Sequence, residues 1–281
     1  MAFFGDRYGT VLIPPPSIQY IPMSTAIARI YTPEGFVVAA DGRTTRSDTL
    51  AVVCDSTQKV FRIEQPGRRL AYALAGAIQL THVDGETILF DFLSVVPMAL
   101  DQLATERYKS LWHYADSLGE RISDSLEHAK EISDGLHPST EGSETHIFLD
   151  GYYEGRGKRL TLTFMHHIHE RSEFEPSTNE LYPGQPIGYG SEIVRKLIGE
   201  RDPRIAAYCL TPQDPNNVTL SEAIRMAENQ IRAHYDPEII KLDEKICSAV
   251  GGDIHIATVT FANGFQWVPG FEWPRMLDTQ S

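Results

Sequence analysis

Two apolar stretches on either side of a turn constrain the start of the fold most strongly. Residues 26–31 and 36–40 are mostly apolar, and a Thr-Pro-Glu-Gly sequence separates them. This pattern predicts a β-hairpin. If the residues flanking the turn face one another, Asp41 falls opposite Ala26, one position from Thr25. The hairpin would then bring a hydroxyl and a carboxylate to the same end of one ribbon.

A second hairpin is predicted to converge on the same place. Residues 57–63 and 70–74 are strand-like and are joined through a Gln-Pro-Gly turn. With the arms paired symmetrically about that turn, Lys59 faces Leu74 and Gly76 follows just beyond the strand end. The two hairpins together would gather a hydroxyl, a carboxylate, an ammonium group and an open glycine backbone at one edge.

This combination resembles the start of proteasome β subunits and their bacterial relatives, the N-terminal-nucleophile hydrolases of the threonine type. The matching features, in chain order, are Thr25, Gly35, residues 37–43, Lys59 with Val60, and Ala75 with Gly76. Fainter matches follow at residues 145–164, 186–191 and 248–256. The resemblance implies an α+β fold, the four-layer αββα sandwich of that family, in a single domain over residues 25–281.

The chemistry of a threonine nucleophile explains why Thr25 would have to begin the mature chain. A threonine hydroxyl is a weak nucleophile until a nearby base takes its proton. The free α-amino group of the same residue, with an ordinary pKa of about 7.7–8, can be that base near neutral pH. The resemblance therefore implies self-cleavage between Ser24 and Thr25, with residues 1–24 as a leader, or propeptide.

The resemblance also assigns roles to neighbouring residues. Lys59 would place positive charge beside the hydroxyl and the amine, Asp41 would keep Lys59 charged, and the Gly76 N–H would donate to the oxyanion. Thr45 and Leu74 match positions that contact substrate in the family. Thr45 would do so through its main chain, and Leu74 would lie in the pocket for the residue before the cleaved bond.

Two departures from the family pattern lie next to the nucleophile and in a later turn. Ser24 replaces the usual glycine before the nucleophile, and glycine there allows the tight backbone geometry of self-cleavage. Tyr189 stands where the family has an active serine in a Gly-Ser-Gly turn, and Ser191 lies two positions on.

A third departure lies in the late motif. Without gaps, Cys247 and Val250 occupy the positions of a supporting aspartate and serine. The neighbouring residues Asp243 and Ser248 can substitute for them if the local backbone differs. The central residues are therefore present, while the residues expected to orient them are altered.

Three functions stay open at this point. The first is a threonine-type endopeptidase in a self-compartmentalised assembly, the second is an inactive proteasome-like structural subunit, and the third is an N-terminal-nucleophile amidase acting on a small amide. The intact set of Thr25, Asp41 and Lys59 favours the first and the third. The three departures favour the second.

The composition excludes other classes of function. The formal net charge of −13 argues against a nucleic-acid binder or a basic membrane-surface protein. No apolar run approaches the roughly 18 residues of a membrane helix, and no signal-peptide pattern begins the chain. Three cysteines without disulfide or metal spacing favour a reducing compartment, so we expect a cytoplasmic protein.

We expect no cofactor and no metal. In the His-rich sequence 166–170, His167 and His169 would share one strand face, but no matching cluster of further ligands accompanies them. The resemblance implies a peptide or unfolded-protein substrate and a homo-oligomer, as a ring or a related assembly. We expect neither a nucleic-acid nor a membrane partner.

Hydrophobic periodicity sets the order of the elements. It predicts strands over residues 25–80, two helices between 83 and about 132, and strands again from 145 to 169. The later elements expected are helices at 192–198, 220–234 and from 237 to 246, then strands at 253–261 and 265–268. Two stacked sheets flanked by helices fit this order.

Overall fold

The structure, a computed structural model, covers most of the chain. The residues that it describes are 25–45, 51–210, 212, 214 and 217–273. The predicted leader over residues 1–24, with Ser24 at its end, lies outside them. Within the described part, no helix combines the length and the apolar character that crossing a lipid bilayer requires.

The first sheet contains the hairpin that begins at Thr25. Tyr31 lies opposite Phe36 in an antiparallel pair, so the predicted register is confirmed. The strands of this sheet, in spatial order, are β12 (Pro186–Tyr189), β1 (Ile27–Thr32), β2 (Gly35–Asp41), β13 (Ile254–Thr260) and β14 (Gly264–Trp267). Two strands from late in the chain therefore enclose the first hairpin.

The second sheet contains the second predicted hairpin. Ile63 lies opposite Leu70, which confirms that register as well. Its strands, in spatial order, are β11 (Glu173–Thr178), β10 (Arg156–Met165), β9 (Glu144–Tyr153), β6 (Arg68–Gly76) and β5 (Val60–Gln65). Two short pairs accompany the large sheets, β3 (Thr44–Thr45) with β4 (Val52–Cys54) and β7 (Gln79–Thr81) with β8 (Ile88–Asp91).

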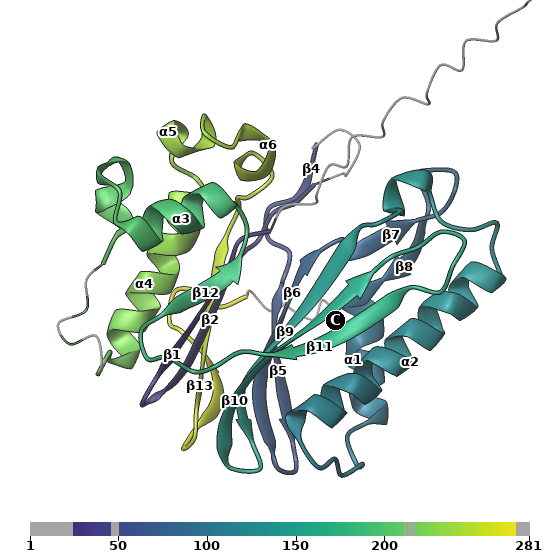
Figure 1. Cartoon of the computed structure of the whole chain (residues 1–281), viewed down its shortest axis with the longest axis horizontal. Helices are drawn as coiled ribbons and strands as arrows, with labels where there is room; N and C mark the ends of the chain where they lie inside the picture. The colour runs from purple at the N-terminus through teal and green to yellow at the C-terminus, as the bar shows by residue number, and fades with distance from the viewer. Residues whose placement is uncertain (1–24, 46–50, 211, 213, 215–216, 274–281) are drawn as a thin grey trace, which may run out of the picture.

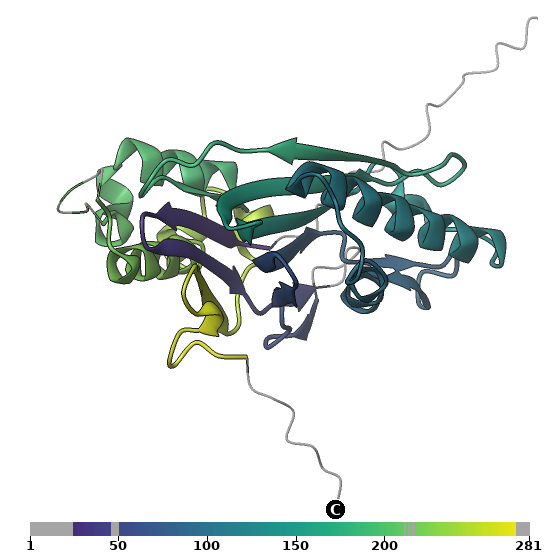
Figure 2. The ribbon, with the colours of Figure 1, turned by 90° about the horizontal axis from the view of Figure 1, so that it is seen from below.

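Helices pack against both sheets, at opposite ends of the molecule (Figures 1 and 2). Their bounds are α1 (Phe92–Gln102), α2 (Leu111–Glu131), α3 (Glu192–Glu200), α4 (Leu220–Ala233), α5 (Pro237–Ile240) and α6 (Glu244–Cys247), with 3₁₀ turns η1 (Pro138–Thr140) and η2 (Pro203–Tyr208). One apolar cluster joins α1 and α2 to the second sheet, another joins α4 to the first sheet, and a third lies between the sheets. The fold is α+β with antiparallel sheets.

Side-chain caps decide where several helices begin. The Thr219 hydroxyl and the Glu222 carboxylate cap α4 reciprocally, as a capping box does. The helix expected to start near residue 83 starts only at Phe92, because Asp91 accepts a hydrogen bond from the Leu93 N–H and caps α1. The prediction of helix over residues 83–91 was therefore wrong, and β8 lies there instead.

Two further differences concern short elements. Strand β11 was not predicted, because its sequence is largely polar and exposed and has no apolar period. The single helix expected from 237 to 246 is divided into α5 and α6. Asp236 caps α5, and Asp243 stands at the start of α6 with its carboxylate turned to another partner.

Candidate active site

The first hairpin closes around Asp41 and leaves Thr25 at its end. The Asp41 N–H donates to the Ala26 carbonyl at 3.1 Å, and the Ala26 N–H donates to Asp41 Oδ1 at 2.8 Å. The backbone therefore fixes the Asp41 carboxylate beside the residue that follows Thr25. This arrangement is the one that the register predicts.

Lys59 connects the hydroxyl and the carboxylate. Its Nζ donates to Thr25 Oγ1 at 3.2 Å and to Asp41 Oδ1 at 3.1 Å, and it also contacts the Arg43 carbonyl. Lys59 and Asp41 are fully buried and Thr25 is 3% exposed. Burial lowers the pKa of the Lys59 ammonium, and the Asp41 carboxylate opposes that shift.

The second oxygen of Asp41 is held by backbone from two parts of the chain. Oδ2 accepts hydrogen bonds from the Arg43 N–H at 3.2 Å and from the Gly251 N–H at 3.1 Å. A buried carboxylate needs such partners, because its charge is costly to remove from water. The late Gly-Gly segment therefore reaches the site through its backbone.

Gly76 ends β6 in a conformation that suits glycine. Its φ is +83°, and a Cβ at this position would lie 2.2 Å from the Glu144 carbonyl oxygen. The Leu74 N–H donates to the Lys59 carbonyl, whereas the Ala77 N–H donates to Glu144 on the other side of the strand. Because N–H groups alternate along a strand, the Gly76 N–H is directed to the side of Lys59.

The two predicted substrate contacts lie in different environments. Thr45 belongs to β3 and pairs with Val52 of β4, close to the edge of the site. Leu74 is fully buried in the apolar cluster between the second sheet and helices α1 and α2. Their roles toward a substrate stay predictions.

Ser191 lies on the other side of Thr25 from Asp41. Ile27 pairs with Tyr189, and a Cβ at Gly190 would lie 3.4 Å from the Thr25 carbonyl oxygen, so Ser191 directly follows a residue that lies beside Thr25. Ser191 Oγ donates to Asp243 Oδ2 at 2.6 Å, and the same oxygen caps α3 by accepting from the Val194 N–H. Asp243, proposed as a substitute for the supporting aspartate, is therefore joined to Ser191, the serine two positions after Tyr189, rather than to Ser248.

His234 completes this group and was missed in the sequence. Its Nε2 lies 3.2 Å from the Ser191 N–H, and its Nδ1 lies 2.9 Å from the Gln230 carbonyl. Burial lowers the pKa of His234, so a neutral ring can accept from Ser191 and donate to Gln230. The sequence places His234 at the end of a predicted amphipathic helix, but that position does not show which residues the ring contacts.

The other supporting candidates make different contacts, and among them Cys247 lies beside Ser191 and Asp243. The Tyr189 ring packs against His146, with ring centroids 4.8 Å apart, and forms an aromatic contact between the sheets. Cys247 is buried, and burial raises the pKa of its thiol to about 11. Ser248 contributes its carbonyl, which accepts from Arg43 Nη1 at 3.4 Å. Within the described part of the chain, none of these three side chains makes a hydrogen bond with Thr25, Asp41 or Lys59.

The comparisons with known proteins concern the fold. No family model and no curated protein sequence matches the chain. One similar solved structure is an Anbu mutant from Hyphomicrobium sp. strain MC1, with a TM-score of 0.48 and 16% identity over 87% of this chain and 86% of that chain. Another is Anbu (ancestral beta-subunit) from Yersinia bercovieri, with a TM-score of 0.49 and 15% identity over 86% of each chain.

The described residues form no group of three or more His, Cys, Asp or Glu side chains suited to a metal ion. Two of the three histidines in the 166–170 sequence make hydrogen bonds: His166 with Thr145 at 2.8 Å and His167 with Glu141 at 3.1 Å. The chemistry available at the Thr25 end is that of a hydroxyl, an ammonium group, a carboxylate and backbone N–H donors.

Proposed function

We propose that this protein is a threonine-type N-terminal-nucleophile hydrolase that cleaves peptide bonds, with Thr25 as the nucleophile. The observation that carries the proposal is the position of Lys59 Nζ, within 3.2 Å of both Thr25 Oγ1 and Asp41 Oδ1 in a buried site. Burial of the Lys59 charge is costly and is offset here by the Asp41 carboxylate, and buried charged groups with shifted pKa values cluster at functional sites.

The proposed reaction begins with self-cleavage of the Ser24–Thr25 bond, which removes residues 1–24 and frees the α-amino group of Thr25. That amine takes the hydroxyl proton while Oγ1 attacks the carbonyl carbon of the substrate amide. When the tetrahedral intermediate collapses, the C–N bond breaks and the leaving amine receives the proton. Water then hydrolyses the resulting ester and restores the hydroxyl.

Lys59 and Gly76 stabilise the charges that develop in these steps. The Lys59 ammonium faces Thr25 Oγ1 and favours its deprotonated form, and Asp41 holds Lys59 in place. The Gly76 N–H, on the Lys59 side of β6, donates to the oxyanion. The close approach of Gly76 to Glu144 requires a residue without a side chain at this point.

Ser191, Asp243 and His234 act as positioning residues. They form a hydrogen-bonded group level with Thr25 on the far side from Asp41. We propose that this group takes the place of the serine and aspartate that Tyr189 and Cys247 do not provide. It would orient the end of β1, where the new amine forms.

We further propose that residues 25–281 form one domain with the four-layer αββα arrangement and that copies of the chain assemble into a ring or a related homo-oligomer. The apolar cluster between the sheets, with helices packed on each sheet, supports the layer order. The assembly is carried over from the resemblance of residues 25–80 to proteasome β subunits.

Intact-mass measurement of the purified protein tests the proposal. We expect wild-type protein to lose the mass of residues 1–24 and Thr25→Ala to stay full length. Labelling of Thr25 by a threonine-directed electrophile should follow processing. A wild-type chain that stays full length and unlabelled would favour the inactive structural subunit instead. Turnover of peptides compared with small amides then separates a peptidase from an amidase.

A further inference from the structure

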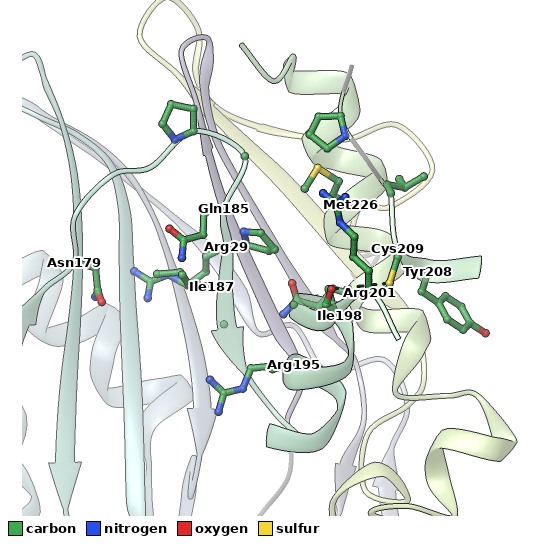
Figure 3. Close-up of a pocket in the computed structure, with 18 of the residues that line it drawn as sticks. Arg29, Asn179, Gln185, Ile187, Arg195, Ile198, Arg201, Tyr208, Cys209 and Met226 are labelled. Atoms are coloured by element: carbon green, nitrogen blue, oxygen red, sulfur yellow. Dashed lines mark hydrogen bonds between the residues drawn. The ribbon is translucent and has the colours of Figure 1, made fainter. Parts of the chain in front are cut away.

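A second polar cavity lies apart from the Thr25 site, where β12 meets α3 and α4 (Figure 3). Its volume is about 700 Å³, within the range of sites that hold small molecules, roughly 300–1,000 Å³. Thr25, Asp41, Lys59 and Gly76 are not among the residues that line it. Any ligand bound here would therefore leave those groups uncovered.

The charge of this cavity is opposite to that of the protein. Arg29, Arg195 and Arg201 line it on different sides, and no Asp or Glu is found among its described lining residues. The chain as a whole has a formal net charge of −13. Arg195 has only a loose ion pair with Glu192, at 3.8 Å, so its guanidinium group is available to a ligand.

Buried charge behind the cavity is also unbalanced toward the positive side. Arg29 and Arg159 share one carboxylate, with Nε of each 2.5 Å from an oxygen of Asp150. All three side chains are buried, and Arg159 Nη2 has no hydrogen-bond partner among the described residues. Two guanidinium groups on one carboxylate leave an excess positive charge, which an anion in the adjacent cavity would offset.

An unpaired acceptor points to a second feature of the ligand. Gln230 lines the cavity from α4 and is 4% exposed, and its Oε1 has no partner in the part of the chain that the structure describes. A buried amide oxygen without a donor costs free energy. A hydroxyl or amine group on the ligand would satisfy it.

We propose that this cavity binds a small organic anion, with a carboxylate or phosphate group held by the arginines and a hydroxyl or amine group donating to Gln230 Oε1. The cavity is too large for a bare ion, and the side chains proposed to bind come from β1, from α3 and the residue that follows it, and from α4. This site is independent of the proposed hydrolase activity.

Isothermal titration calorimetry on the full chain tests the site with defined probes. Malate offers carboxylates and a hydroxyl, glycerol 3-phosphate offers a phosphate and hydroxyls, and glycerol is the uncharged control. We expect saturable binding of at least one anion, weakened by added NaCl, and none of glycerol; which anion binds more tightly identifies the acidic group. Absence of saturable binding of both anions up to roughly 10 mM would overturn the proposal.

Matched variants locate the binding. Arg195→Gln and Arg201→Gly should each weaken binding about tenfold, and glycine suits the left-handed backbone at position 201. Lys196→Ala is the control, since it removes a charge from the same helix outside the lining. Equal weakening by Lys196→Ala would show general surface attraction and refute the site.

Gln230→Leu tests the donor group separately. Wild-type protein should bind malate more tightly than succinate, which lacks the hydroxyl, and the variant should lose that preference while still binding succinate. Retained succinate binding shows that the variant is folded. A malate preference that survives in the variant contradicts the role of Gln230.

Discussion

The two halves of the candidate active site are assembled from very different distances along the chain. Thr25, Asp41, Lys59 and Gly76 come from two successive hairpins, and their positions follow from strand registers. Ser191, His234 and Asp243 come from the ends of β12, α4 and the α5–α6 turn. The first half is set by local pairing, whereas the second exists only because α3, α4 and α6 pack together at the edge of the first sheet.

This difference predicts where a substitution acts. We call Thr25, Asp41, Lys59 and Gly76 the hairpin half of the site, and Ser191, His234 and Asp243 its supporting half. Changes in the hairpin half remove groups proposed to contact the reacting atoms, so they should reduce activity strongly. Changes in the supporting half should act through orientation and cost less. The following predictions run from the largest expected effect to the smallest.

Lys59→Ala should have the largest effect. It leaves the Asp41 carboxylate buried without its cation, which should lower the free energy of unfolding by roughly 3–5 kcal/mol. Turnover and self-processing should fall at least about a thousandfold. Denaturant unfolding, mass measurement and peptide hydrolysis check this result.

Lys241→Ala is the control for lost charge, since Lys241 makes an exposed ion pair with Glu238. Its effect on stability should stay below about 1 kcal/mol. Undiminished turnover in Lys59→Ala would remove the lysine from the proposed mechanism.

Gly76→Ala tests the proposed oxyanion donor. The added Cβ would meet the Glu144 carbonyl at 2.2 Å, so the backbone must shift. We expect the free energy of unfolding to fall by roughly 1–3 kcal/mol and turnover to fall about a hundredfold. Gly142→Ala is a matched control, because Gly142 also has positive φ (+68°) but nothing within 4 Å of its Cβ position. Equal effects of the two variants on turnover would argue against a role for Gly76.

Ser191→Ala tests the supporting half. It removes the hydrogen bond to Asp243 and the cap of α3, which should lower the free energy of unfolding by about 1 kcal/mol. Turnover should fall about tenfold to a hundredfold, while Thr25 labelling continues slowly. Ser248→Ala, which keeps the backbone carbonyl that Arg43 contacts, should change stability by less than about 0.5 kcal/mol. The reverse ranking of these two serines would show that Ser248 is the supporting residue.

Last comes His166, which stands behind the Gly76 turn and whose expected effect is on stability rather than on turnover. Thr145 Oγ1 donates to the Ala77 carbonyl, so His166 Nε2 donates to Thr145, and Nδ1 is buried without a partner among the described residues. Burial accordingly lowers the pKa of His166 to about 3.

The sign of the pH effect follows from that shift. An unfolded histidine has a pKa of about 6.5, so neutral His166 stabilises the fold above pH 6.5, and this contribution is lost as pH falls toward 3. The loss amounts to about 1.4 kcal/mol per pH unit. His166→Gln keeps a donor for Thr145. It should remove this contribution to the pH dependence of the free energy of unfolding, measured between pH of about 7 and 5. An unchanged slope, or the same change in the exposed His169→Gln, would contradict the assignment.

Particular residues show what could be predicted. The places of Asp41 and Lys59 beside Thr25 were predicted correctly, because a hairpin with a defined turn permits one register that keeps its apolar faces buried. The role of Asp91 as a helix cap was missed, since an apolar run does not reveal where a helix begins. Matching residues by sequence position pointed to Tyr189 and Cys247, but the structure joins Ser191 to Asp243.

The sequence by itself determined the two hairpins, and with them the meeting of Thr25, Asp41 and Lys59, because strand pairing is a local matter of turn and pattern. Only the tertiary structure decided which later residues stand beside Thr25, and that an arginine-lined cavity forms between β12, α3 and α4. These arrangements place Thr25 and Arg29 next to residues more than a hundred positions later in the sequence. No local pattern encodes them, because helix packing is set by the shapes of whole apolar faces.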